Sequence, residues 1–284
     1  MNSPKKYFFI FGVLSMFYFV CLGLTTPPET KIIKLRELNP KPAKKITVRK
    51  DFKYRKYNHV KEFYKRLALP ITELCVQHRV PPGAVLSILS LESGWGQGYV
   101  GKITGNFLSL NASGNEAELP ALKMPKNIFT KKTIIDRTKL AKTSKTSIVW
   151  ENRPPSLKKD YRPQGIAGTT KDLDYFIRRP DELTQANLKN VTDFVSRFIS
   201  ETSRIKAYRE ARALLDQQIA EHGVGILFDD SLNRKFVYTI GGRPNSYNFR
   251  KTWPQKVMSI YKNVGANELL KDLYTNKNTF EQAW

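Results

Sequence analysis

The sequence predicts an α+β fold that is mostly helical, and two observations support this prediction. Apolar residues recur at helical spacing before and after residues 105–165, whereas that middle stretch loses the period and is rich in Lys, Thr, Asn and Pro. The chain has 284 residues, of which 40% are hydrophobic, so it can bury one substantial core or two smaller ones. Helices on both sides of a small irregular β region are typical of an α+β domain with a cleft beside the β region.

The individual elements follow from the local patterns. A first helix is predicted over 60–79, with a kink at Pro70, and a second over 80–92, entered through prolines. Short strands are predicted at 106–110, 128–130 and 147–151. Further helices are predicted at 169–178, 188–201, 204–222, 253–263 and 266–275. The folded domain is therefore expected to cover 59–276, followed by a tail at 277–284.

The start of the chain differs from the rest in composition. Lys5 and Lys6 precede an uncharged apolar run over residues 7–24. This run is at the short end for a membrane span and long for the core of a signal peptide, so we expect residues 1–25 to be an uncleaved anchor, with a cleaved signal as the alternative. Residues 26–58 hold prolines among many Lys and Arg and predict an extended basic linker.

The charge is strongly unbalanced. The chain holds 48 Lys and Arg against 25 Asp and Glu, a formal net charge of +23. Such a field concentrates polyanions, whether nucleic acid, anionic lipid or an acidic cell-wall polymer. No nucleic-acid recognition motif accompanies the charge, so nucleic acid is not an expected partner.

The cysteines and histidines predict no metal or disulfide chemistry. Cys75 lies in a helix-like run, and its only possible partner is in the apolar N-terminal segment, so we expect a buried thiol that packs as a small apolar group. His59, His78 and His222 show no ligand spacing, and a zinc site is not expected.

One carboxylate stands in an unusual place, at the end of an apolar stripe. Glu92 is four residues after Ile88 and three after Leu89, so helical spacing places it on their face. Desolvation there favours the neutral carboxyl group, which is what a general acid in glycosidic bond cleavage needs. The alternative is a helix-end glutamate that is capped by backbone amides or paired with an arginine.

The residues after Glu92 suit a site for sugars. Gly94 and Gly96 allow close backbone approach, and Trp95 offers a flat apolar surface on which sugar rings can stack. Spacing alone does not separate this interpretation from the structural alternative.

The chain resembles the N-acetylglucosaminidases of glycoside hydrolase family 73 in two neighbouring segments, SILSLESGWG and GNFLSL. Members of that family have a helix ending in A-x-x-E-S-x-W-G, followed by N-x-F-G-I, and the Bax-type proteins of Gram-negative bacteria are the nearest branch. The resemblance covers about Phe63 to Tyr261. It implies a lysozyme-like fold, in which a helical lobe and a small β lobe flank a cleft, and it implies no metal or organic cofactor.

The resemblance also implies roles for the residues of these two segments. Glu92 matches the catalytic acid of the family. Asn106 and Phe107 match the segment that lines the cleft floor, and Ser109 stands where members usually have glycine. As substrate-binding residues we therefore expect Trp95, Asn106 and Phe107. The alternative for Asn106 and Phe107 is a turn residue and a core aromatic.

A later segment, SIVWENRPPSLKKDYRP, resembles the family's β hairpin. This match makes Glu151 the carboxylate of the β lobe and Tyr161–Arg162 the family's F-R pair, with Trp150 in place of the usual threonine. The alternative for Glu151 is a solvated charge at the end of a strand.

The segment YNFRKTWPQKVMSIY resembles the closing motif of the family. Tyr247 then takes the place of the tyrosine that reaches the cleft, and Trp253 takes the place of the second tyrosine. Arg250 stands where many members have an aspartate. The alternative for Tyr247 is a packing residue.

The function implied is hydrolysis of the β-1,4 bond after N-acetylglucosamine in peptidoglycan. Glu92 would protonate the leaving oxygen, and either Glu151 would activate water or the substrate's acetamido group would attack with Tyr247 positioning it. The alternatives are a muramidase or lytic transglycosylase on the same fold, and a non-catalytic module for cell-wall binding or assembly.

The expected partners are peptidoglycan glycan strands and, through the N-terminal segment, the membrane of the cell envelope. The chain is expected to act as a monomer. Its expected location is the periplasm, where the N-terminal segment anchors it to the inner membrane, or outside the cell if that segment is cleaved.

Overall fold

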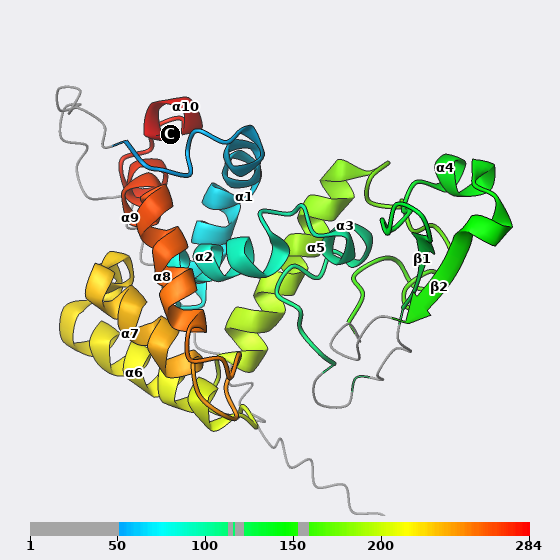
Figure 1. Ribbon diagram of the computed structural model, residues 1–284. Helices are drawn as coiled ribbons and strands as arrows, with labels where there is room; N and C mark the ends of the chain where they lie inside the picture. The colour runs from blue at the N-terminus through cyan, green and yellow to red at the C-terminus, as the bar shows by residue number, and fades with distance from the viewer. Residues whose placement is uncertain (1–50, 113–115, 117–121, 153–158) are drawn as a thin grey trace, which may run out of the picture. The chain divides into compact units, whose positions relative to one another are not determined.

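The computed structural model describes residues 51–112, 116, 122–152 and 159–284 (Figure 1). All of them lie in one compact unit. Within these ranges helices predominate and a single two-stranded sheet is present, which confirms the mostly helical α+β prediction. The anchor or signal predicted at 1–25 and most of the predicted linker lie outside the described residues. Among the described helices, none combines the length and apolar character that a membrane crossing requires.

The elements follow one another in the order shown in Figure 1. The helices are α1 (Asn58–Gln77), α2 (Pro82–Ser93), α3 (Tyr99–Thr104), α4 (Arg137–Lys142), α5 (Pro180–Asp193), α6 (Lys206–His222), α7 (Asp230–Ile240), α8 (Trp253–Val264), α9 (Ala266–Leu270) and α10 (Phe280–Ala283). The strands are β1 (Lys123–Asn127) and β2 (Ile148–Asn152). Short 3₁₀ segments are η2 (Lys145–Ser147) and η5 (Val224–Phe228), and π-helical turns are η4 (Phe194–Phe198) and η6 (Lys271–Thr275).

Helix α2 is apolar on every side and is buried from Pro82 to Ser90. It packs against α1, α7, α8 and α9, so it forms the centre of the helical core. The buried hydroxyl groups of Ser87 and Ser90 donate to carbonyls one turn earlier, at 2.8 Å in both cases. A helix without a polar face can only be buried on all sides, and α2 therefore has more than the single apolar stripe that the spacing predicts.

Most predicted helices are present, with shifted ends. Helix α1 runs through Pro70 without ending there. Helices α6 and α8 agree closely with the predicted segments. Helix α5 begins at Pro180, earlier than predicted, because a proline and two acidic residues suit the first helical turn. Helix α7 is not among the predictions, although the Asp229 side chain caps its first turn and its apolar residues face the core.

Cys75 is buried in α1, as predicted. Burial raises the pKa of its thiol, since the apolar surroundings disfavour the thiolate. Cys75 therefore packs as a small apolar group.

The sheet is an antiparallel hairpin in which Met124 faces Glu151 and Lys126 faces Val149. Strand β2 matches the predicted strand at 147–151 within one residue. The strand predicted at 128–130 is wrong, because these residues form a turn directly after β1. The chain turns after β1, where the Asn127 side chain accepts hydrogen bonds from two backbone N–H groups. The strand predicted at 106–110 is wrong, because this segment forms a loop.

Residues 169–178 form turns, so the helix predicted there is wrong. Arg162, whose side chain is 0% exposed, donates to the carbonyls of Thr169 and Lys171 and forms a bidentate ion pair with Asp160. Asp172 has a φ of 46°, in the left-handed region that interrupts a right-handed helix. The backbone carbonyls of this segment therefore accept hydrogen bonds from a buried guanidinium group, and the segment does not form a helix.

Both ends of the described chain pack onto the helices. Arg55 donates to the backbone carbonyls of Ala283 and Trp284 at 2.8 and 3.0 Å. The Trp284 ring lies 5.8 Å from the ring of Tyr64 in α1. The predicted domain limits at 59 and 276 are therefore too narrow, because residues 51–57 and the predicted tail belong to the folded body.

We expect Asp160→Asn to lower the free energy of unfolding by about 3 kcal/mol or more, because it leaves the Arg162 guanidinium buried without its counter-charge. Urea unfolding at neutral pH measures this change. The control is Glu281→Gln, which breaks an ion pair with Lys65 between side chains that are 58% and 51% exposed, and we expect a far smaller loss. Equal losses in the two variants would contradict the structural role of the buried pair.

Candidate functional site

Glu92 lies where the buried helix α2 reaches its end. Every residue from Pro82 to Ser90 is buried, whereas Leu91 and Glu92 are only partly buried. Gly94, at a φ of 57°, ends the helix in the left-handed conformation, and the N–H of Trp95 donates to the carbonyl of Ser90 at 2.9 Å. The predicted helix-end position of Glu92 is therefore present, and its carboxyl group stands at the margin of the apolar core.

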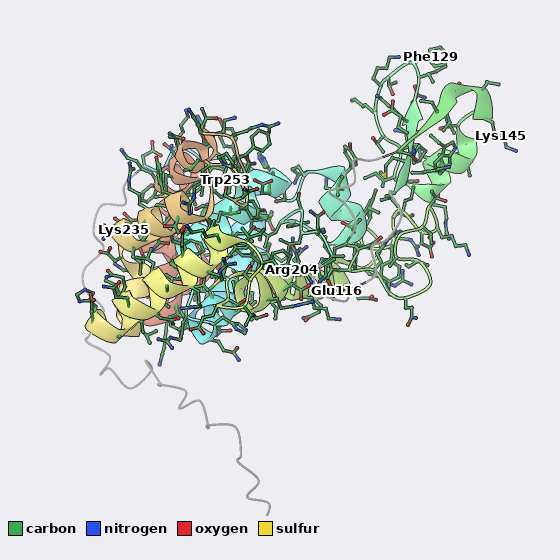
Figure 2. All side chains as sticks on the ribbon, turned by 90° about the horizontal axis from the view of Figure 1, so that it is seen from below. Glu116, Phe129, Lys145, Arg204, Lys235 and Trp253 are labelled. Carbon is green, nitrogen blue, oxygen red and sulfur yellow. The ribbon has the colours of Figure 1, made fainter. Side chains whose placement is uncertain are left out.

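The partner of Glu92 is neither a backbone amide nor an arginine side chain. Its Oε1 accepts a hydrogen bond of 2.8 Å from Nε1 of Trp253, the first residue of α8, in the helical part of the chain (Figure 2). Among the described residues, no hydrogen-bond donor contacts the second oxygen, Oε2. One oxygen of the carboxyl group is thus held in place by Trp253, and the other has no hydrogen-bond donor within the described ranges.

The surroundings of Glu92 favour its neutral form. Burial raises the pKa of this carboxyl group, because desolvation penalises the charged form. The hydrogen bond from Trp253 and the positive charge of Arg250 act in the opposite direction, and burial outweighs both. Glu92 therefore keeps its proton to a higher pH than an ordinary glutamate does.

Tyr247 lies close enough to Glu92 for the two groups to interact electrostatically. Its ring centroid is 5.2 Å from that of Trp253, and its hydroxyl group donates to the carbonyl of Leu108 at 2.6 Å. Burial raises the pKa of Tyr247 well above its usual value, with further contributions from Glu92 and Tyr208. Tyr247 is a hydrogen-bond donor that connects the loop before α8 to the loop after α3.

Phe249 is a candidate contact residue that the sequence reasoning missed. Its side chain is 69% exposed and lies two residues from Tyr247. The guanidinium group of Arg250 lies 5.8 Å from the centre of its ring. The sequence signal that could have identified it is an aromatic residue inside the predicted motif, since aromatic rings offer stacking surfaces for sugars.

Asn106 and Phe107 are buried, at 2% and 1% exposure. Asn106 exchanges hydrogen bonds with the backbone of Leu110, donates to the carbonyl of Lys159 and accepts from the side-chain amide of Asn190. Phe107 packs against Phe63 with ring centroids 6.3 Å apart. These contacts give the two residues a structural part in holding the loop, as in the alternative considered from sequence.

Tyr161 and Arg162 also hold structure rather than line an opening. The Tyr161 hydroxyl group donates to Asp193 at 2.8 Å and accepts from Asn190 at 3.2 Å. Arg162 forms the buried pair with Asp160 described above. The segment around Lys159 is thereby fixed to α5.

Trp95 is partly buried, and other aromatic side chains already contact its ring. Tyr54 and His59 meet it edge to face, with centroid distances of 5.4 and 5.9 Å. Its indole N–H is buried and has no hydrogen-bond partner among the described residues. Its expected stacking on sugar stays a prediction, restricted to the part of the ring that these neighbours leave open.

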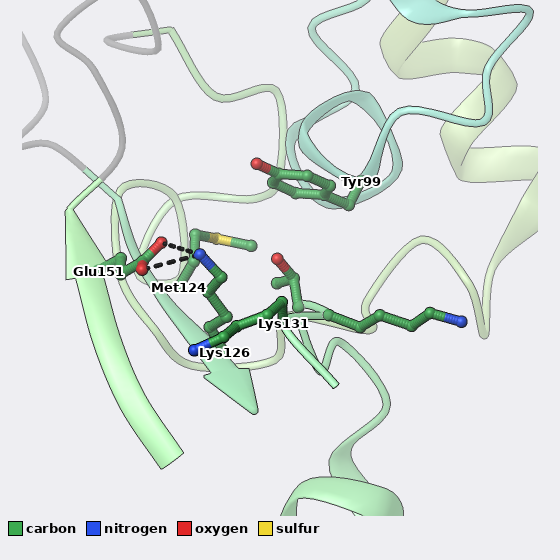
Figure 3. Close-up of a pocket in the computed structure, with 7 residues that line it drawn as sticks. Tyr99, Met124, Lys126, Lys131 and Glu151 are labelled. Carbon is green, nitrogen blue, oxygen red and sulfur yellow. Dashed lines mark hydrogen bonds and ion pairs between the residues drawn. The ribbon is translucent and has the colours of Figure 1, made fainter. Parts of the chain in front are cut away.

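Glu151 lies in the β region, as expected, and is 52% exposed. Its carboxylate oxygens lie 3.0 and 3.2 Å from Nζ of Lys126 on the neighbouring strand (Figure 3). Within the described ranges, no hydrogen bond or ion pair joins Glu151 to Glu92 or Tyr247. The structure thus brings Glu92, Tyr247 and Trp253 together and leaves Glu151 with a separate lysine partner.

No group of three or more His, Cys, Asp or Glu side chains within the described ranges is arranged to hold a metal ion. Comparison of the chain with protein-family models, curated proteins and solved structures found no match.

We expect Glu92→Gln to stabilise the protein at neutral pH. The raised pKa means that the folded state holds the Glu92 proton more tightly than the unfolded chain does. The free energy that this proton adds to folding is fully present below the unfolded pKa of about 4.3. It is lost as the pH rises through the pKa of the folded state. Glutamine keeps an acceptor for Trp253 and carries no charge. The variant should therefore melt at a higher temperature than the parent at pH 7 and together with it near pH 4.

Thermal unfolding of both proteins between pH 4 and 8 measures this difference. Glu73→Gln removes an exposed carboxylate from α1 and serves as the control, for which we expect little change. A Glu92→Gln difference that does not vary with pH would contradict a desolvated acid at this position.

Proposed function

We propose that this protein is a peptidoglycan hydrolase that cleaves the β-1,4 bond after N-acetylglucosamine, with Glu92 as the general acid. The observation that supports this best is the state of Glu92, a carboxyl group at the end of an apolar helix whose pKa is raised by burial. Cleavage of a glycosidic bond requires such a group, because the leaving oxygen must receive a proton.

The arrangement around Glu92 supports the resemblance drawn from sequence. Tyr247 and Trp253, which match the closing motif of family 73, both interact with Glu92. Ser109 has a φ of 53°, in the left-handed region favoured by glycine, which agrees with the glycine that members usually have at the matching place. A lysozyme-like arrangement of a helical lobe and a β lobe around a cleft is part of this proposal.

In the first step the Glu92 proton resides on Oε2, because the Trp253 N–H occupies Oε1. Oε2 protonates the leaving glycosidic oxygen, and the C–O bond breaks. The carboxylate that results keeps its hydrogen bond from Trp253 and the attraction of Arg250, so both residues stabilise the charged product of the proton transfer.

Two routes complete the reaction, and they predict different products. If Glu151 acts as general base, water attacks from the opposite face and the anomeric configuration inverts. If the acetamido group of the substrate attacks, the configuration is retained, and Tyr247 contributes by fixing the loop at Leu108. The configuration of the first product decides between these routes.

A muramidase or lytic transglycosylase is the closest alternative, because either activity needs the same desolvated acid. A non-catalytic wall-binding module would not need a carboxyl group with a raised pKa. The location in the cell envelope rests on residues 1–25, which lie outside the described residues, and stays a prediction.

We expect Glu92→Gln to reduce the release of soluble fragments from purified sacculi by at least about 10²-fold, because the amide cannot donate the acid proton. Chromatography of the digest measures the rate, and the reducing-end sugar of the fragments identifies the bond cleaved. Glu73→Gln is the control and should digest at the parental rate. Parental activity in the Glu92→Gln variant would show that another group supplies the proton.

We expect Arg250→Gln to move the alkaline limb of the pH–rate profile to higher pH. Arg250 is exposed and lowers the pKa of Glu92 by its positive charge, so its removal lets the acid keep its proton to a higher pH. Arg234→Gln, on the exposed side of α7, removes the same charge and should leave the limb in place. Equal shifts in both variants would indicate an effect of net charge alone.

A further inference from the structure

A cavity of about 470 Å³ lies between α3 and the β1–β2 hairpin. It is lined by Tyr99, Met124, Lys126, Lys131, Lys132, Thr133 and Glu151. Figure 3 shows the ring of Tyr99 facing the Glu151–Lys126 pair across this space. Its volume is within the range of small-ligand sites.

The strand register places the polar lining on one face of the hairpin. Met124 faces Glu151 across the strands, and Lys126 is two residues further along, so the three side chains lie on the same side of the sheet. Lys126 and Glu151 are diagonal neighbours and form the ion pair described above. Met124 is 2% exposed and, with the ring of Tyr99, supplies the apolar part of the cavity.

The cavity has an excess of positive charge. Three of its lining residues are lysines and one is a glutamate. Glu151 pairs with Lys126, whereas Lys131 and Lys132 have no ion-pair partner within the described ranges. A half-enclosed space of this charge favours an anionic group.

The loop that carries the two unpaired lysines is held by backbone hydrogen bonds. The N–H of Lys131 donates to the carbonyl of Asn127, and the N–H of Asn127 donates to the carbonyl of Lys132, both at 2.9 Å. The next residues add a bridge between Thr133 and Lys126. The backbone of this loop is therefore fixed, so a bound ligand has to order only the exposed side chains of the two lysines.

We propose that this cavity binds a carboxylate of the peptide stems that peptidoglycan carries, with Lys131 and Lys132 as its ligands and Tyr99 and Met124 as the apolar wall. The identity of the ligand rests on the proposed function. The cavity thus selects glycan that still bears its peptides. Glu151 limits the strength of this binding, because its ion pair with Lys126 keeps that lysine from binding the ligand.

The test measures binding of purified full-length protein, in mild detergent, to soluble disaccharide–peptide fragments of peptidoglycan and to the same disaccharide without peptide. Isothermal titration gives both dissociation constants. The parent should bind the peptide-bearing fragment more tightly. Lys131→Gln with Lys132→Gln should weaken that binding about tenfold and leave the peptide-free disaccharide unaffected.

The matched control is Lys139→Gln with Lys142→Gln, which removes the same charge from exposed positions on α4, outside the cavity. It should keep the parental preference. Glu151→Gln should tighten binding of the peptide-bearing fragment, because it releases Lys126. Equal affinity of the parent for both fragments, or an equal loss in the control pair, would overturn the proposal.

Binding and hydrolysis are measured separately, so the two proposals fail in different ways. Digestion of sacculi without a preference for the peptide-bearing fragment would reject the carboxylate site alone. Preference for that fragment without digestion would reject the hydrolase and keep the binding site.

Discussion

The structure depends on burying α2, a helix that has no polar face. Its serines satisfy their hydroxyl groups at carbonyls of the same helix, and four other helices cover its surface. The first carboxyl group after this buried stretch is that of Glu92, which lies at the margin of the core and takes one hydrogen bond from Trp253. Its raised pKa is therefore a consequence of how the core is built, and the site and the core cannot be varied independently.

A second constraint joins segments that are distant in the sequence. Tyr247 connects the loop before α8 to Leu108, which lies in the loop after α3. Asn106 of that second loop is in turn bonded to Lys159 and to Asn190 of α5. Each of these bonds uses a buried or partly buried polar group, which costs free energy if it loses its partner. These polar contacts therefore hold together segments that lie far apart in the sequence.

The sequence predicts those features that depend on local periodicity. Helices such as α1, α6 and α8, the buried Cys75 and the helix-end position of Glu92 follow from apolar spacing. The turns at 169–178 could not be foreseen, because they depend on the buried guanidinium group of Arg162, and nothing in its neighbourhood marks it as buried. Burial of Asn106 likewise depends on tertiary contacts, since asparagine suits a solvent-exposed turn as well as a buried one.

Charge placement completes the physical picture. A protein with a net charge of +23 attracts an anionic polymer, but a cation near a catalytic acid lowers its pKa and favours loss of its proton. Arg250 is the cation whose effect on Glu92 is visible among the described residues, and burial outweighs it. Lys131 and Lys132, which have no ion-pair partner among the described residues, lie instead in the loop that follows β1. Under the proposed function, attraction of an anionic substrate and retention of the Glu92 proton make opposite demands on nearby positive charge. Placing cations on an element other than the one that carries Glu92 meets both demands.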